Sequence, residues 1–320
     1  MESLFLVLMP GIIAFGVSIL IGPMIIPLLR KVKAGQTVRE DGPKTHLKKT
    51  GTPTMGGIII LIAVLTGSLV YVREYPKIIP VLFLTLGFGM IGFLDDYIKV
   101  VLHRSMGLYP WQKFLCQTVV TAVFAIYLVQ TGQVNLAMQI PFLPEFYLDL
   151  GFWNVPVLFF VVIGTANGAN FTDGLDGLAS SVTVIIACFF TVVALHTESG
   201  IEPVTCAVVG ALMGFLLFNV HPASVFMGDT GSLALGGFVA ASAYMMQLQA
   251  FLPIICLIYV VEVVSVILQV TWFRISGGRR ILRMAPLHHH FELCGFTEPG
   301  IVAGFSAVTA LLCVIALKGL

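Results

Sequence analysis

Charged side chains are scarce in this chain of 320 residues, in which Asp, Glu, Lys and Arg together make up only 10%. A soluble domain carries about 25% charged residues. Hydrophobic residues reach 58% here, more than the interior of a soluble domain of this length can bury. The composition therefore excludes a soluble domain, a disordered chain and a coiled coil. What remains is a polytopic membrane protein.

Two further scarcities narrow the function. The net charge is only +1, so no basic surplus indicates nucleic acid as a partner. The six cysteines include no CxxC pair, and all but Cys294 lie in apolar runs, which is typical of small apolar fillers. The stretch 1–29 lacks a basic start, and its apolar run is too long for the core of a cleavable signal.

Ten apolar stretches approach the length of about 20 residues that a helix needs to cross a bilayer. Because lipid cannot satisfy open backbone groups, each stretch is predicted to be helical. The ten predicted spans are Leu4–Leu29, Met55–Val72, Ile78–Leu94, Phe114–Gln130, Val155–Ala169, Leu178–Leu195, Val204–Phe218, Leu233–Gln247, Leu252–Phe273 and Ile301–Leu317. We therefore predict an all-α, polytopic integral membrane protein in which residues 1–320 form a single transmembrane domain.

Lysine and arginine are distributed unevenly between the loops that these spans define. The loops after the first, third and ninth spans, with their borders, hold 14 of the 17 basic residues, and all three lie on one side if the spans alternate. The other side holds only Arg73, Lys77 and Lys318. Basic loops mark the cytoplasmic side of a membrane. The pattern predicts an even number of spans, both termini outside, and the motifs described below in the cytoplasm.

Two acidic motifs stand where predicted spans end on that side. Asp95 and Asp96 are adjacent, so they could bind a divalent cation, hold a base, or form a solvated pair at the interface. Residues 167–177 contain Asn170, Asp173 and Asp176 among glycines that let backbone approach a ligand. Carboxylate oxygens suit Mg²⁺, and the density of polar groups favours a site over a plain turn.

A third motif, residues 219–232, precedes the eighth predicted span. It contains Asn219 and a Gly-Asp-Thr-Gly-Ser turn in which Asp229 lies between glycine and threonine. Such a turn at a helix start offers backbone N–H groups to an anion, and Asp229 could hold a metal that shares that anion. Phe226 could stack on a base or could anchor the chain at the interface.

A fourth motif contains three consecutive histidines, His288, His289 and His290, downstream of an arginine cluster. Consecutive histidines do not easily reach one ion, so contact with phosphate fits better than a zinc site. Glu262 lies in the middle of the ninth span. A carboxylate inside a membrane is either functional or a structural partner for a neighbouring helix.

A fifth motif, residues 46–57, combines lysines with a Gly/Thr-rich turn before the second span. Lys49 and Thr54 suit a phosphate, although the Walker pattern for ATP is missing. Together the five motifs gather carboxylates, histidines, lysines and glycine-rich helix starts on one membrane face. This combination predicts a site for Mg²⁺ and a multiply charged phosphate, with a lipid as one substrate.

In these five motifs the chain resembles the polyprenyl-phosphate N-acetylhexosamine-1-phosphate transferases. The runs His46–Gly57 and Pro286–Glu292 resemble the branch of bacterial phospho-N-acetylmuramoyl-pentapeptide transferases in particular. The resemblance implies ten helices, a homodimer and a location in the bacterial cell membrane. It implies transfer from UDP-N-acetylmuramoyl-pentapeptide to undecaprenyl phosphate, a membrane lipid, which gives lipid I and UMP with Mg²⁺ as cofactor.

The resemblance also implies roles for individual residues. It makes Asp95, Asp96, Asp229 and His288 catalytic, with Asp229 as a ligand of Mg²⁺. Those it places in substrate binding or support are Lys49, Thr54, Asn170, Asp173, Asp176, His289 and His290. From the third motif itself, Asn219 and Phe226 are also predicted to bind substrate. Whether one carboxylate acts as a base for direct attack or forms a covalent intermediate stays open.

Two other functions are compatible with parts of the pattern. A sister enzyme that transfers GlcNAc-1-phosphate to the same lipid carrier would share the aspartate motifs, whereas the histidine run with its Phe-Glu favours the muramoyl branch. A transporter of an anionic solute would place charges at the middle of the membrane. Only Glu262 lies there in this chain, so the enzyme is favoured.

Overall fold

The computed structural model describes residues 2–31, 51–102, 104, 106–132 and 136–320, and it is mostly helical. Each predicted span overlaps a helix, but the ninth, Leu252–Phe273, is broken at Cys256 into a short and a long helix. These helices are α1 (Glu2–Lys31), α2 (Gly57–Leu69), α3 (Ile78–Val100), α4 (Pro110–Thr131), α5 (Asn154–Thr172), α6 (Leu178–Thr197), α7 (Glu202–Asn219), α8 (Gly228–Met245), α10 (Leu257–Ile275) and α12 (Glu298–Leu317). The shorter elements are α9 (Leu252–Ile255), α11 (Leu287–Leu293), the 3₁₀ helices η2 (Gly151–Trp153) and η3 (Gln249–Phe251), and the strands β1 (Met138–Ile140) and β2 (Leu143–Leu148).

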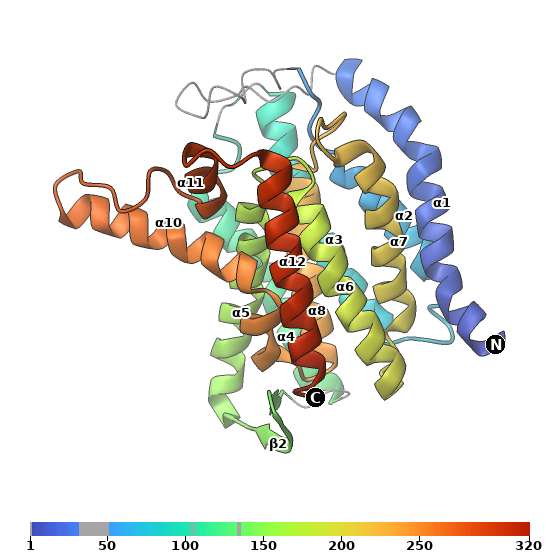
Figure 1. The fold of residues 1–320 in the computed structure, drawn as a ribbon. Helices are drawn as coiled ribbons and strands as arrows, with labels where there is room; N and C mark the ends of the chain where they lie inside the picture. Colours follow the sequence, from blue (N-terminus) through green and yellow to red (C-terminus); the bar gives the residue numbers. More distant parts are fainter. Residues whose placement is uncertain (1, 32–50, 103, 105, 133–135) are drawn as a thin grey trace.

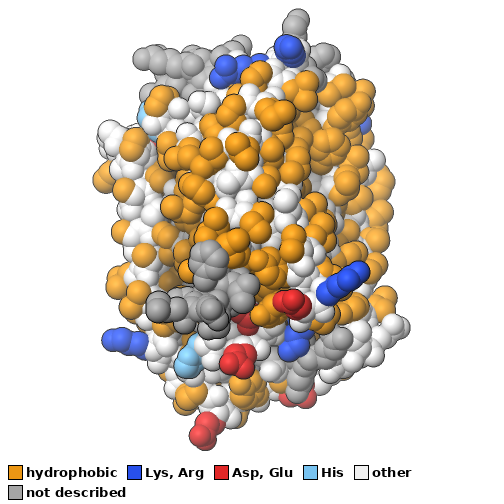
Figure 2. Space-filling model, turned by 90° about the vertical axis from the view of Figure 1, so that its right-hand side faces the viewer, with side chains coloured by type: hydrophobic (Ala, Val, Ile, Leu, Met, Phe, Trp, Pro, Cys, Tyr) orange, Lys and Arg blue, Asp and Glu red, His pale blue; other side chains and the backbone are white. Residues whose placement is uncertain are grey.

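Eight helices in the described part of the chain are long and apolar enough to cross a membrane. The exceptions among the ten are α2, which has 13 residues, and α8, whose first turn is polar and rich in glycine. Every residue of α8 from Thr230 to Met245 is buried, so this helix contacts protein instead of lipid and needs less hydropathy than a lipid-facing span. Figure 2 shows a broad hydrophobic band on one face of the molecule, with charged side chains towards its two ends.

The bundle is built around α8, which packs along α3 and α5. Glycines make the close approach possible. A Cβ atom on Gly237 of α8 would lie 2.8 Å from the carbonyl oxygen of Leu84 in α3, and one on Gly236 would lie 2.4 Å from the Cα atom of Ala166 in α5. Small residues at contacts of this kind let helix backbones meet in a membrane.

Two features depart from a plain bundle. The helix α10 projects sideways from the other helices (Figure 1), and its outer half exposes Leu268, Trp272, Phe273 and Ile275. The strands β1 and β2 form an antiparallel hairpin that the all-α prediction did not include. The hairpin lies at the end of the molecule where the N- and C-termini both lie, opposite α11 (Figure 1).

Candidate active site

Three carboxylates, those of Asp95, Asp96 and Asp229, meet where the end of α3 contacts the first turn of α8. One oxygen of each lies within 4.8 Å of the others. Asp95 and Asp96 are almost wholly buried, and Asp229 is partly buried. The two helices come this close because Gly92 faces α8: a Cβ atom there would lie 2.0 Å from the carbonyl oxygen of Asp229. The structure thus brings together three of the four residues that the resemblance makes catalytic; the fourth, His288, lies on α11.

Asp96 forms the cap of α8. Its carboxylate accepts hydrogen bonds from the backbone N–H groups of Asp229, at 3.2 Å, and Thr230, at 2.9 Å. The hydroxyl of Thr230 donates to the same carboxylate at 2.6 Å. The first N–H groups of a helix have no partner within the helix, and its N-terminus attracts negative charge. Asp96 therefore fixes the start of α8, and with it the position of Asp229.

Two lysines neutralise this carboxylate group. The Nζ atom of Lys99 lies 2.5 Å from Asp95 Oδ2 and 3.1 Å from Asp229 Oδ2. Lys113, at the start of α4, places its Nζ atom 2.9 Å from Asp229 Oδ2. Sequence reasoning used both lysines only for orientation and missed them as site residues. A signal for Lys99 was present, because it stands four residues after Asp95 on one helix face.

Asn170, at the end of α5, joins the same cluster. Its side-chain amide donates to Asp229 Oδ1 and to Ser232 Oγ, each at 2.9 Å. Beside it lies a cavity of about 420 Å³ between α3, α4 and α5. Polar and apolar side chains both line this cavity: Asp95, Lys99, Met106, Leu108, Pro110, Lys113, Phe114, Gln117, Asn167, Asn170 and Phe171. A charged inner end and an apolar wall suit a molecule with an anionic head and an apolar tail.

Asp173 follows α5 and lies close enough to Asp229 and Asp96 for their charges to act on it. Burial, and then the negative charges of Asp229 and Asp96, raise the pKa of Asp173 well above its usual value. A hydrogen bond from the backbone of Gly228 acts in the opposite direction but is the weaker influence. The turn between α5 and α6 therefore adds a fourth acidic group to the site, as the sequence motif predicts.

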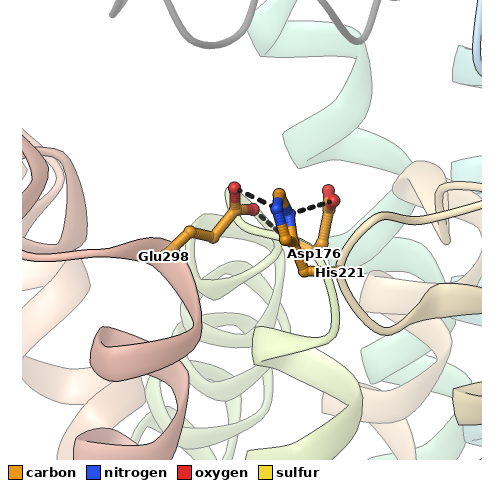
Figure 3. A group of neighbouring side chains, drawn as sticks. All are labelled: Asp176, His221 and Glu298. Atoms are coloured by element: carbon orange, nitrogen blue, oxygen red, sulfur yellow. Dashed lines mark hydrogen bonds and ion pairs between the residues drawn. The ribbon is translucent and has the colours of Figure 1, made fainter.

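Asp176, in the same turn, belongs to a second cluster with His221 and Glu298 (Figure 3). The Nδ1 atom of His221 lies 3.1 Å from Asp176 Oδ2 and 3.3 Å from Glu298 Oε2. The backbone N–H of Asp176 also donates to Glu298 Oε1 at 2.6 Å. These contacts tie the turn to the loop before α8 and to the first turn of α12. Sequence reasoning did not assign His221 and Glu298, which are distant from Asp176 along the chain.

The segment before α2, part of the motif 46–57, is joined to the loop of the motif 219–232 by backbone hydrogen bonds. The N–H of Gly56 donates to the carbonyl of Phe226 at 2.8 Å, and that of Phe226 donates to the carbonyl of Pro53 at 2.8 Å. Thr54 is buried in this segment, close to Gly228: a Cβ atom on that glycine would lie 2.7 Å from Thr54 Oγ1. Lys49, predicted in the same motif, lies outside the described residues.

Asn219 and Phe226 occupy the two ends of the loop before α8. Asn219 is buried, donates to the carbonyl of Val225 at 3.0 Å and accepts from the hydroxyl of Ser180 at 2.8 Å. These contacts hold the loop from inside. Phe226 is partly buried next to the turn that begins α8.

The three histidines lie on α11 and point to three different partners. His288 is buried, and its Nδ1 atom lies 3.1 Å from Glu262 Oε2. The Nδ1 atom of His289 lies 2.8 Å from Glu292 Oε2. His290 Nδ1 accepts a hydrogen bond from the backbone N–H of Arg283 at 3.1 Å. Of the three, His288 is the one packed against the acidic turn, because its ring lies over Gly174.

Comparisons with known proteins agree with this site. The family model "Glycosyl transferase family 4" matches residues 78–247, and "Phospho-N-acetylmuramoyl-pentapeptide-transferase signature 1" matches residues 49–61. A phospho-N-acetylmuramoyl-pentapeptide-transferase of Acetivibrio thermocellus is 48% identical over 95% of this chain and 92% of its own. A transferase of the same name from Clostridioides difficile is 45% identical over 94% of each chain.

One from Desulforamulus reducens is 48% identical over 96% of this chain and 93% of its own. Similarity of this extent spans almost the full length of this chain and of each relative. The chain therefore belongs to the phospho-N-acetylmuramoyl-pentapeptide transferase family.

Proposed function

We propose that this protein transfers phospho-N-acetylmuramoyl-pentapeptide from UDP-N-acetylmuramoyl-pentapeptide to undecaprenyl phosphate, releasing UMP and forming lipid I. The observation that carries the proposal is the meeting of Asp95, Asp96 and Asp229 beside two lysines in a chain of this family. A sister enzyme that uses UDP-GlcNAc is less well supported, because the relatives and the matched signature both belong to the muramoyl branch.

The acceptor lipid binds in the cavity between α3, α4 and α5. Its phosphate lies at the charged inner end, near Lys99 and Lys113, and its isoprenoid chain leaves past Phe114. A lipid phosphate is mostly ionised at neutral pH, so its oxygen needs at most a modest base before it attacks the β-phosphorus of the donor. Asp95 is the carboxylate that lines the cavity and is therefore placed to face the incoming oxygen.

The donor lies on the other side of Asp229, against the turn 173–177 and the loop 219–226. Asp173, Asp176, Asn219 and Phe226 support the nucleotide from this side. His288 faces the diphosphate, and His289 and His290 bind the donor from the same short helix. Transfer of a phosphoryl group depends mainly on position and on neutralised charge, because little covalent chemistry is left for the protein. The site supplies both through its cations and through the start of α8.

The residues of the site also fit Mg²⁺. Asp229 is the proposed ligand, since it is the least buried of the three carboxylates and its oxygens lie within reach of the other two. Mg²⁺ prefers hard oxygen ligands, and it is usually coordinated by one or two carboxylates together with phosphate oxygens. When bound, the ion would neutralise charge on the diphosphate and polarise its phosphorus–oxygen bonds.

The proposed arrangement in the membrane has ten spans, with α2 and α8 among them, and the site on the cytoplasmic face of the bacterial cell membrane. Both termini lie at one end of the molecule, and α11 lies at the other (Figure 1). The basic residues of the loops support placing the α11 end in the cytoplasm. A homodimer is proposed from the family alone.

The proposed reaction is tested with purified protein, undecaprenyl phosphate and UDP-N-acetylmuramoyl-pentapeptide. We expect UMP release that requires both substrates and stops when EDTA removes Mg²⁺. The same assay with UDP-GlcNAc separates the muramoyl transferase from its sister enzyme. UMP release from UDP-GlcNAc but not from the muramoyl donor would overturn the proposal in favour of the sister activity.

A further inference from the structure

Glu262 is a carboxylate in the middle of α10 that has no place in the mechanism described so far. It is fully buried, and it lies on the helix that projects from the bundle. Both of its oxygens face one residue: Oε1 accepts the backbone N–H of His288 at 3.2 Å, and Oε2 lies 3.1 Å from the Nδ1 atom of the His288 ring. A single side chain thus holds both the start of α11 and the ring that follows.

The other ring nitrogen of His288 points towards the active site. A Cβ atom on Gly174 would lie 2.1 Å from Nε2, so the ring reaches the turn 173–177 only because that residue is glycine. Within the part of the chain that the structure describes, neither ring nitrogen makes a hydrogen bond although the residue is 1% exposed, but Nδ1 lies within ion-pair distance of Glu262 Oε2 whereas Nε2 has no polar partner. A buried polar atom without a partner is costly, which indicates that a ligand completes it.

We propose that Glu262 is a positioning residue for the transferase reaction. Its carboxylate keeps the proton of His288 on Nδ1, which leaves Nε2 as the atom that meets the donor diphosphate. A carboxylate beside one imidazole nitrogen fixes both the orientation of the ring and the nitrogen that carries the proton. The same arrangement orients the histidine in serine hydrolases on unrelated folds. This proposal rests on the proposed function, because it assigns a task to Nε2 within that reaction.

The proposal explains why a carboxylate occurs inside a membrane helix at all. A carboxylate at this depth costs several kcal/mol unless it is paired, so a site with only a packing role would be filled by an apolar residue. The other titratable groups near the ring are His289 on the same helix, whose ring centre lies 4.1 Å away, and Asp173 in the adjoining turn. Among the described residues, the charged group within 4 Å of Nδ1 is Glu262.

The test uses Glu262→Gln, which keeps the shape of the side chain and removes its charge. Protein labelled with ¹⁵N-histidine is examined in detergent by NMR, and the His288 signals are identified by their loss in His288→Gln. In the unmodified protein we expect the proton on Nδ1. In Glu262→Gln we expect a mixture of the two tautomers, together with a kcat lower on the order of 10–100-fold and a KM for the donor within about threefold of the unmodified value.

Ser265→Ala is the matched control on the same helix. Ser265 is buried one turn after Glu262 and contacts only its backbone carbonyl, at 2.7 Å, so its removal should change neither the tautomer nor kcat. If Glu262→Gln does not give a monodisperse protein, Glu262→Asp keeps the charge on a shorter side chain and should keep the proton on Nδ1.

Two outcomes would overturn the proposal: an unchanged His288 tautomer in Glu262→Gln, or a loss of kcat accompanied by an equal change of KM and a lower Tm, as expected of a purely structural residue. Failure of the proposed function is distinguishable, since it would appear as an unmodified protein that releases no UMP, whatever the NMR spectrum shows.

Discussion

Asp229 differs from the two carboxylates beside it in what it contacts. Asp96 is engaged by the start of α8, and Asp95 by Lys99 and by the backbone N–H of Leu108 at 2.8 Å. Asp229 meets lysine and asparagine side chains that can move aside for a substrate or an ion. At the scale of the residue, therefore, Asp95 and Asp96 are held by backbone groups in addition to their place in the site, whereas Asp229 is held by side chains.

The first prediction concerns Asp229→Asn, which keeps the shape and removes one negative charge. Turnover should fall by a factor on the order of 10² or more, because a bound metal supplies several kcal/mol of transition-state stabilisation. UMP release and the Tm of the same preparation are the measurements. Near-normal release at ordinary Mg²⁺ concentration would move the metal to another carboxylate.

A second prediction uses the raised pKa of Asp173. The pKa of Asp173 is higher in the folded protein than its unfolded value of about 4, so the folded protein binds more protons at this side chain. The unfolding free energy therefore falls as the pH rises from about 4 through the folded pKa. Asp173→Asn removes this loss. We expect its Tm, measured in EDTA, to match the unmodified protein near pH 4 and to exceed it at pH 8. A Tm difference that does not depend on pH would contradict the burial of a titrating Asp173.

At the scale of elements, the start of α8 is held by a carboxylate from α3 and by the backbone of the segment before α2. The backbone N–H of Gly57 donates to the carbonyl of Met227 at 2.9 Å. A Cβ atom on Gly57 would lie 2.1 Å from the backbone nitrogen of Gly231, so the two helices meet without side chains between them. The position of the site thus depends on contacts between three helix ends.

A third prediction follows for Gly57→Ala. The added methyl group meets backbone, which cannot move as a side chain can, so the unfolding free energy should fall by about 3 kcal/mol, the upper end of the usual cost of overpacking. Gly164→Ala in α5 is the control, since nothing lies within 4 Å of a Cβ atom there. Thermal unfolding in detergent should show a lower Tm for Gly57→Ala only. Equal Tm values would mean that the two helices do not meet at Gly57.

A fourth prediction separates Asp96 from Asp229. Asp96→Asn places an amide N–H₂ group among three donors, so a buried N–H of α8 loses its acceptor at a cost of about 1–3 kcal/mol. Turnover and Tm should both fall in this variant, whereas Asp229→Asn should lose turnover with little change of Tm. Parallel unfolding curves of the two variants provide the measurement, and a Tm unchanged by Asp96→Asn would contradict the capping role.

Much of this could be predicted from the sequence, for identifiable reasons. Apolar runs fix the helices because lipid leaves the backbone no other partner. Motifs rich in Gly and Asp predicted that the end of α3, the turn after α5 and the start of α8 form one site. The pairing of Glu262 with His288, the contact of His221 with Glu298, and the place of Lys113 could not be predicted, because each joins residues that are distant along the chain and carries no local spacing.

At the scale of the whole molecule, the charged site and the two termini lie at opposite ends. The fifth prediction concerns which of these ends faces the cytoplasm. In cells, a cysteine introduced at position 279 should react with an impermeant thiol reagent only after permeabilisation, and one at position 73 should react in intact cells, because the basic loops mark the cytoplasm. Cys294→Ser removes an exposed native thiol in both variants. Labelling of position 279 in intact cells would reverse the proposed orientation.

The glycine contacts around α8 also bear on how an inhibitor of this site could be escaped. A Cβ atom at Gly57 or Gly92 would collide with the backbone of α8, and one at Gly174 would collide with the His288 ring. A substitution there removes the fold or the reach of His288 together with the inhibitor. Resistance by mutation is therefore confined to the cavity wall, at residues such as Met106 and Phe114. A compound that binds the carboxylates and lysines at the inner end of the cavity, rather than this wall, leaves the bacterium few viable escapes.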